Sequence, residues 1–111
     1  LSLHDALPIL VKIRKMSQSL LRAQDERIRK MTLADTIDLM NSPDYKERFK
    51  AEYYQIRIRT LKLRDMCEAW DAGRLNFAPA CSRNLYQNQL SRMGAYCRVL
   101  RNRAQMEGIE L

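Results

Sequence analysis

Residues that interrupt a helix are scarce in this chain. Its 111 residues include three glycines and three prolines, and aromatic residues make up only 7%. Sheets with many tight turns need more glycine and proline than this, whereas the 30% of charged residues and the abundant Leu, Arg, Met and Gln are typical of helices. The composition therefore predicts an all-helical protein.

Histidine is scarcer still, and the cysteines are not paired. There is one histidine, His4, and the three cysteines are widely spaced, with no CxxC pair. A zinc site or a disulfide framework is therefore not expected, and we predict no metal and no cofactor. The sequence also lacks a Gly-rich phosphate loop and any Ser or Cys with an evident base, so we do not expect an enzyme.

No apolar run approaches the roughly 18 residues that a membrane-spanning helix needs. We therefore expect a soluble, cytoplasmic protein without a membrane partner. Twenty Lys and Arg against thirteen Asp and Glu give a net charge of +7, which favours polyanions such as nucleotides or nucleic acid. A basic, solvated helix surface explains the charge equally well. Most of the cations are arginine, which suits bidentate phosphate binding, whereas no helix-turn-helix spacing or basic arm predicts specific DNA binding.

Residues 1–9 (LSLHDALPI) lack an initiator methionine and resemble a translated sequencing adapter. A signal peptide is the competing interpretation, but the stretch has no basic start and too short an apolar core. We therefore treat these residues as a non-native leader. Met16, Met31 and Met40 are alternative native start sites.

Residues 10–41 form the second predicted segment, which is helical but has a weak apolar face at its start. Within it, residues 32–40 predict a short amphipathic helix. Leu33, Ile37 and Met40 would share one face of it.

The third predicted segment, residues 42–111, contains two long helices. Ser42 and Pro43 are typical of a helix start, and Gly73 of a helix stop, so the first helix should run from Pro43 to Ala72. At about 1.5 Å per residue it would be about 45 Å long. Its apolar residues alternate steps of four and three, as in a heptad repeat: Phe49, Tyr53, Ile56, Thr60, Leu63, Cys67 and Trp70.

The second long helix should start at Cys81 or Ser82 and end at Gly108. Its apolar residues follow the same heptad steps, and two such helices joined by a short connection pack antiparallel. The sequence therefore predicts a long antiparallel helical hairpin preceded by a short N-terminal helix. Tyr54, Ile58 and Leu61 would remain uncovered on the first helix, which predicts a homo-oligomer.

Candidate ligand-binding residues lie beside the heptad positions. An antiparallel pair brings the Tyr45 end of one helix near the Arg103 end of the other, where arginines and tyrosines could hold an anion and stack on a base. Alternatively these side chains are ordinary helix surface, and Arg48–Glu52 and Arg103–Glu107 simply pair. The eight candidates are Tyr45, Arg48, Tyr53, Arg59, Gln89, Arg92, Tyr96 and Arg103.

Three stretches carry a resemblance to a known family: DYKERFKAEYYQ (residues 44–55), AGRLNFAPAC (residues 72–81) and VLRNRAQMEGIEL (residues 99–111). On these the chain resembles a family of short helical phage and prophage proteins, seen largely in gut metagenomes and related to a crAss-like phage product. It is also similar in architecture to phage proteins that sequester nucleotide immune signals.

The resemblance implies a phage anti-defence sponge in the cytoplasm of an infected bacterium. Such a protein would bind a cyclic oligonucleotide or an ADP-ribose derivative without hydrolysing it, and its partners would be copies of itself and this small anionic ligand. The alternative is a structural or interaction protein, a helical-hairpin oligomer that binds a host protein or nucleic acid.

Overall fold

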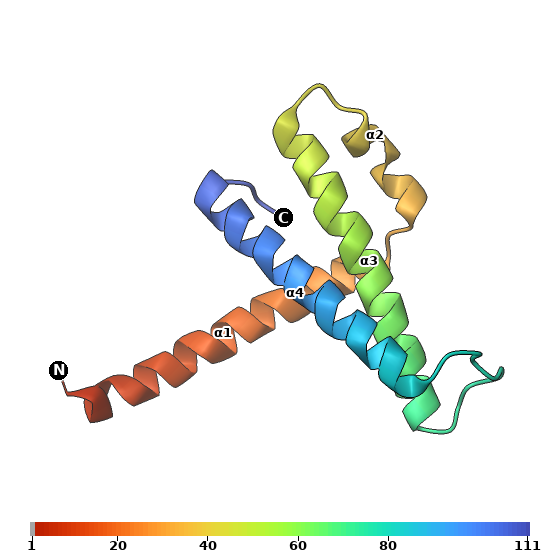
Figure 1. The fold of residues 1–111 in the computed structure, drawn as a ribbon. Helices are drawn as coiled ribbons and strands as arrows, with labels where there is room; N and C mark the ends of the chain where they lie inside the picture. The colour runs from red at the N-terminus through yellow and green to blue at the C-terminus, as the bar shows by residue number, and fades with distance from the viewer. Residues whose placement is uncertain (1) are drawn as a thin grey trace.

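The computed structural model describes residues 2–111 (Figure 1). None of these residues lies in a strand, which confirms the all-helical class. Helices α3 and α4 pack against each other, the C-terminal part of α1 packs on α3, and the N-terminal part of α1 projects away from the pair (Figure 1). The elements, in chain order, are α1 (Leu3–Arg29), the 3-10 helix η1 (Leu33–Thr36), α2 (Ile37–Met40), α3 (Tyr45–Asp71) and α4 (Arg83–Glu107).

Helix α3 begins at Tyr45, slightly later than predicted. The capping side chain is that of Asp44, whose carboxylate accepts a hydrogen bond from the Lys46 backbone N–H at 3.0 Å. Asp44 is therefore the cap, and not the predicted Ser42. At the other end Gly73 has a φ of +70°, which confirms it as the left-handed stop.

Helix α4 begins and ends as predicted. The Ser82 hydroxyl accepts a hydrogen bond from the Leu85 N–H at 3.2 Å, which caps the first turn. Gly108, with a φ of +68°, ends the helix, and the following Ile109 N–H donates to the Ala104 carbonyl at 2.8 Å.

Contacts between α3 and α4 occur at both ends of the pair. Next to the connection, the rings of Trp70 and Tyr86 lie 5.8 Å apart, edge to face. At the far ends, the Tyr45 hydroxyl donates to Glu107 at 2.8 Å. The two helices therefore run in opposite directions. The buried core combines residues of α1, α3, α4 and the C-terminal tail: Ile28, Phe49, Tyr53, Ile58, Leu61, Cys97, Leu100, Ala104 and Ile109.

The apolar patch expected to mediate self-association is already covered within the chain. Ile58 and Leu61 are 3% and 2% exposed, and they belong to one buried cluster with Ile28 of α1. Tyr54 packs half-buried against the same cluster. The premise that the hairpin leaves this patch free was therefore wrong, because the last turns of α1 lie across α3.

The short helix before α3 forms, but of the three apolar residues predicted to share a face only Leu33 packs against the core. Ile37 and Met40 are 48% and 47% exposed, whereas Thr36 is 1% exposed. The Thr36 hydroxyl donates to the Leu33 carbonyl at 2.7 Å and accepts from the Gln55 amide at 3.0 Å. The first turn is a 3-10 helix with three residues per turn, which rotates the faces away from the α-helical expectation.

The molecule is extended for its length. Its radius of gyration is 17.2 Å and its principal extents are 54 × 41 × 22 Å, whereas a compact domain of this size has a radius of gyration of roughly 13 Å. Residues 3–20 of α1 account for much of the difference, since nearly all of them are exposed. Within residues 2–111, no helix combines the length and the apolarity needed to cross a bilayer.

Candidate functional site

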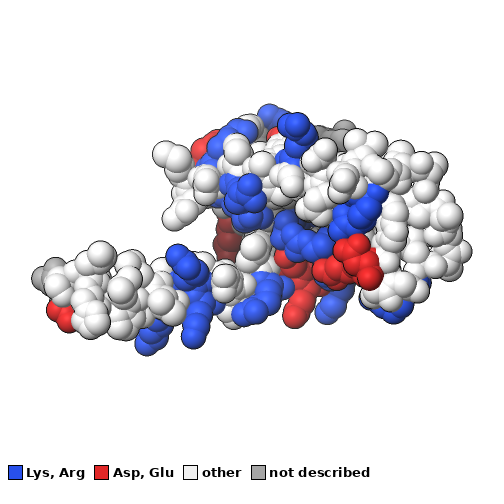
Figure 2. Space-filling view, turned by 60° about the horizontal axis from the view of Figure 1, so that its bottom comes forward, with Lys and Arg blue, Asp and Glu red and all other residues white. Residues whose placement is uncertain are grey.

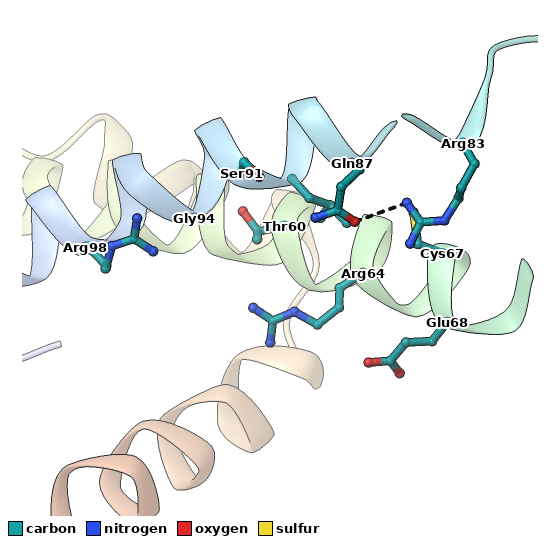
Figure 3. Close-up of a pocket in the computed structure, with 10 residues that line it drawn as sticks. Thr60, Arg64, Cys67, Glu68, Arg83, Gln87, Ser91, Gly94 and Arg98 are labelled. Atoms are coloured by element: carbon teal, nitrogen blue, oxygen red, sulfur yellow. Dashed lines mark hydrogen bonds between the residues drawn. The ribbon is translucent and has the colours of Figure 1, made fainter. Parts of the chain in front are cut away.

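A cavity of about 420 Å³ lies between α3 and α4, toward the connection (Figure 3). Its volume falls within the roughly 300 to 1,000 Å³ of small-molecule sites. Four residues of α3 and six of α4 line it: Thr60, Arg64, Cys67 and Glu68, with Arg83, Gln87, Leu90, Ser91, Gly94 and Arg98.

Helical periodicity brings these residues to one groove. On α3, Thr60, Arg64 and Cys67 are separated by four and three positions, so they share one helix face. On α4, Gln87, Leu90 and the rest of the lining follow similar steps. The groove therefore lies along the contact between the two helices.

Arg83 is held by an ion pair at one end of the cavity. Its Nε and Nη2 donate to the two carboxylate oxygens of Asp71 at 2.9 and 3.0 Å, and its Nη1 donates to Gln87 at 3.2 Å (Figure 3). The hydrogen bond from Arg83 lowers the pKa of the Asp71 carboxyl below its usual value. The charge of Arg83 is thus largely matched within the protein.

Arg64 and Arg98 carry charges that are not matched in this way. Among residues 2–111, neither side chain forms an ion pair or a hydrogen bond. Both guanidinium groups lie at the groove, one from each helix (Figure 3). The only acidic residue in the described lining is Glu68. The cavity therefore has an excess of positive charge.

The surrounding surface is also basic, but of mixed sign. Figure 2 shows Lys and Arg side chains along the projecting α1 and over the neighbouring body, where acidic side chains lie among them. The excess of cations agrees with the net charge of +7. The net positive charge attracts anions, and the α3–α4 cavity is one of the concave places on this surface that basic side chains line.

Gly94 lies in the middle of α4 and lines the cavity. A glycine in a helix interior costs about 0.5 to 1 kcal/mol of stability relative to alanine. Its φ is not positive, so no backbone requirement explains it. A Cβ added there would meet only the Arg98 side chain, at 3.6 Å. The absence of a side chain keeps this part of the groove open.

Three of the eight predicted site residues meet at the other end of the helix pair. The Tyr45 hydroxyl accepts a hydrogen bond from Arg103 at 3.0 Å, and the Arg103 guanidinium lies 5.0 Å from the Phe49 ring centroid. Tyr96 is close enough for the charge of Arg103 to lower its pKa, although its hydrogen bond to Glu52 raises that pKa more strongly. Tyr45 and Arg103 are therefore in contact at this end and Tyr96 lies near them, whereas Arg48 is not part of the cluster.

This end cluster is nevertheless more balanced in charge than the sequence suggested. Glu107 accepts from Tyr45 and pairs with Arg103 at 3.4 Å, as the i, i+4 alternative predicted. The Tyr96 hydroxyl donates to Glu52. Glu52 therefore does not form the pair with Arg48 that the sequence allowed. The two carboxylates occupy the donors that an anion would use.

Three further predicted residues have structural roles or contacts elsewhere. Tyr53 is fully buried, and its hydroxyl donates to Gln24 at 2.6 Å and accepts from Arg101 at 3.1 Å. Arg48 donates to the Ser42 carbonyl at 2.8 Å, just before α3. Arg92 is exposed.

Arg59 and Gln89 line a separate, open groove of about 370 Å³ on another face of the α3–α4 pair. Lys62, Met66 and Met93 also contribute to it. The eight predicted residues therefore fall in several places, and none of them lines the α3–α4 cavity.

The sequence analysis did not find the cavity residues because it looked for arginines next to tyrosines. Arg98 and the other α4 residues of the cavity have no tyrosine among them. One signal was available, since Gly94 interrupts an otherwise good helix with no capping role. Within residues 2–111, no three His, Cys, Asp or Glu side chains are grouped in a way that could hold a metal ion.

Comparison with known proteins gives one match. The family model of Sequestin matches residues 43–106, which is more than half of the chain and contains the whole α3–α4 cavity. No curated protein and no solved structure matches. These comparisons give no evidence of kinship with a crAss-like phage product. The extent of the family match shows that the chain belongs to the Sequestin family.

Proposed function

We propose that this protein is a phage anti-defence sponge, which binds a nucleotide immune messenger and sequesters it without hydrolysis. The name of the Sequestin family suggests sequestration and specifies no substrate. The observation that carries the proposal is the α3–α4 cavity, where Arg64 and Arg98 lie without acidic partners among the described residues. The ligand class is a cyclic oligonucleotide or an ADP-ribose derivative.

The chemistry of the cavity supports binding of a phosphate-bearing molecule. Guanidinium groups stay charged at all physiological pH values and can donate two parallel hydrogen bonds to one phosphate. Thr60, Gln87 and Ser91 add polar groups along the same groove. These groups bind and orient a ligand, and the described lining includes no histidine.

The cluster of Tyr45, Tyr96 and Arg103 is the competing location for the ligand. Its tyrosines could stack on a base, and it lies within the family match. We favour the cavity because the donors of the cluster are already bonded to Glu52 and Glu107. A ligand at the cluster would have to displace those carboxylates first.

The test is calorimetry of the purified protein with cyclic dinucleotides, larger cyclic oligonucleotides, ADP-ribose and its cyclic derivatives. A bound ligand should be recovered intact after the protein is heated. Arg64→Ala and Arg98→Ala should each weaken binding by about 1.5 to 3 kcal/mol, roughly 10- to 150-fold. Arg92→Ala is the matched control, since it removes an exposed arginine of α4 outside the cavity.

Two results would overturn this proposal in different ways. If Arg103→Ala and Tyr96→Phe abolish binding while the cavity variants do not, the ligand occupies the end cluster. If the recovered nucleotide is cleaved, or if none of the panel binds, the protein is not a sponge for this class.

The alternative is a structural or interaction protein, and the exposed apolar side chains of α1 favour it. Leu7, Leu10, Ile13 and Met16 are 48 to 57% exposed, which is unusual for large apolar side chains on one helix. These side chains would also support the proposed homo-oligomer in the bacterial cytoplasm. Light scattering decides the oligomeric state, and a salt-sensitive shift of duplex DNA without nucleotide binding would favour the alternative.

A further inference from the structure

We infer that the α3–α4 cavity recognises a sugar hydroxyl next to phosphate, with Glu68 accepting a hydrogen bond from the hydroxyl while Arg64 and Arg98 bind the phosphates. This inference rests on the proposed function and specifies the part of the nucleotide that is recognised. It concerns the charged residues of the lining that have no ion-pair partner among the described residues. Arg83 is not one of them, because it is paired with Asp71.

Glu68 is unusual because it is acidic in a cavity that otherwise suits anions. Its side chain is exposed, and among residues 2–111 it forms no ion pair and no hydrogen bond. A carboxylate in this position repels phosphate. It contributes to binding only if the ligand also presents a hydrogen-bond donor.

A second pair in the same molecule provides a comparison for Arg64 and Glu68. Arg103 and Glu107 have the same order and the same i, i+4 spacing, and they pair at 3.4 Å. Arg64 and Glu68 do not pair in the described structure, although helical geometry allows it equally well. Both side chains extend from the same side of α3 at the cavity (Figure 3). Both charges are therefore available to a ligand.

A ribose carries the donors that Glu68 would need. In dinucleotide-binding Rossmann sites an acidic side chain accepts a hydrogen bond from a ribose hydroxyl. The described lining contains no aromatic ring, so base stacking contributes little there. The sugar and the phosphates, and not the base, should then provide most of the recognition.

Glu68→Gln separates this role from a merely electrostatic one, because it keeps the shape and removes the charge. The probes are inorganic pyrophosphate, which has phosphates only, and ADP-ribose, which adds ribose hydroxyls. Pyrophosphate should bind several-fold more tightly to the variant, since a like charge is removed. ADP-ribose should bind about tenfold more weakly, since a charged acceptor is replaced by a neutral one. Glu110→Gln is the control, because it changes the net charge equally at the exposed tail.

Three other outcomes would contradict either the sugar inference or the proposed function. If Glu68→Gln strengthens the binding of both probes, Glu68 only repels anions, and the sugar inference is wrong although the sponge proposal stands. If Arg64→Ala and Arg98→Ala leave the affinities for pyrophosphate and ADP-ribose unchanged, the cavity does not bind phosphate, and the sugar inference is also wrong. If neither the parent protein nor any variant binds a nucleotide of the panel, the proposed function itself fails.

Discussion

Arg57 of α3 and Asp25 of α1 form an interior ion pair with two hydrogen bonds. The Nε–Oδ1 and Nη2–Oδ2 distances are 2.8 and 2.7 Å, and the two side chains are 3% and 13% exposed. Burial lowers the pKa of the Arg57 guanidinium, but the hydrogen bonds and charge of Asp25 outweigh it, and the pKa is raised. The charge of Arg57 is thus tolerated in the core only because α1 supplies its partner.

Removing one member of this pair should destabilise the protein strongly. Asp25→Ala leaves the buried guanidinium unpaired, so we expect a loss of about 3 to 5 kcal/mol in the free energy of unfolding, measured with urea. Glu26→Ala, at the exposed neighbouring position, should change it by less than about 0.5 kcal/mol. The double variant Asp25→Leu, Arg57→Met should recover much of the loss. Equal stability of Asp25→Ala and the parent would show that α1 does not dock in this way.

Two truncations should separate the docked part of α1 from its projecting part. A chain that starts at Met16 keeps Asp25 and Ile28, so it should unfold at nearly the same temperature as the parent. A chain that starts at Met31 loses both and exposes Ile58 and Leu61 to water. It should melt at a much lower temperature or aggregate, as followed by circular dichroism. Full stability of the shorter chain would contradict the observed core.

Gly94→Ala should raise stability and lower ligand affinity together. Alanine is favoured in a helix interior by about 0.5 to 1 kcal/mol, and the added Cβ meets the Arg98 side chain at an ordinary 3.6 Å. The same methyl group narrows the proposed ligand site. Ala95→Gly makes the reverse change at the adjacent exposed position, so it should lower stability without affecting binding. If the Gly94→Ala variant binds the ligand as tightly as the parent, Gly94 is not part of the binding site.

The protein should lose stability at alkaline pH through Tyr53. Burial raises the pKa of this tyrosine above its usual 10.0, against the opposing effect of Arg101. A raised folded-state pKa means that the stabilising contribution is complete below pH 10 and is lost as the pH rises through the folded value. Tyr53→Phe should therefore flatten the fall in stability above pH 10, as measured by urea unfolding at several pH values. An unchanged slope would mean that other groups control alkaline unfolding.

Local signals predicted the end of α3 and both ends of α4, whereas they did not predict that α1 would be one continuous helix from Leu3 to Arg29. Long-range packing was the part that sequence could not supply. Gly73 and Gly108 end helices because a positive φ suits glycine, and this depends on no distant residue. The docking of α1 depends on Ile28 together with the polar side chains of Gln24 and Asp25. Polar residues give no apolar period to detect, so this contact was not predicted.

The candidate site was harder to predict for a related reason. The stripe of tyrosines and arginines that was chosen does form contacts, but its donors meet Glu52 and Glu107 across the helix pair. Whether an arginine is paired depends on all the residues around it in the folded chain, those on its own helix and those on the other helices. The sequence alone therefore could not predict that Arg64 and Arg98 are unpaired, because this depends on how α3 packs against α4.

The projecting α1 also affects how the size of the protein should be measured. A radius of gyration of 17.2 Å belongs to a much larger compact protein than one of 13.1 kDa. An elongated monomer diffuses slowly and elutes early from a gel-filtration column, where it can be mistaken for a dimer. The oligomeric state should therefore be assigned from light scattering or sedimentation equilibrium, which report mass independently of shape.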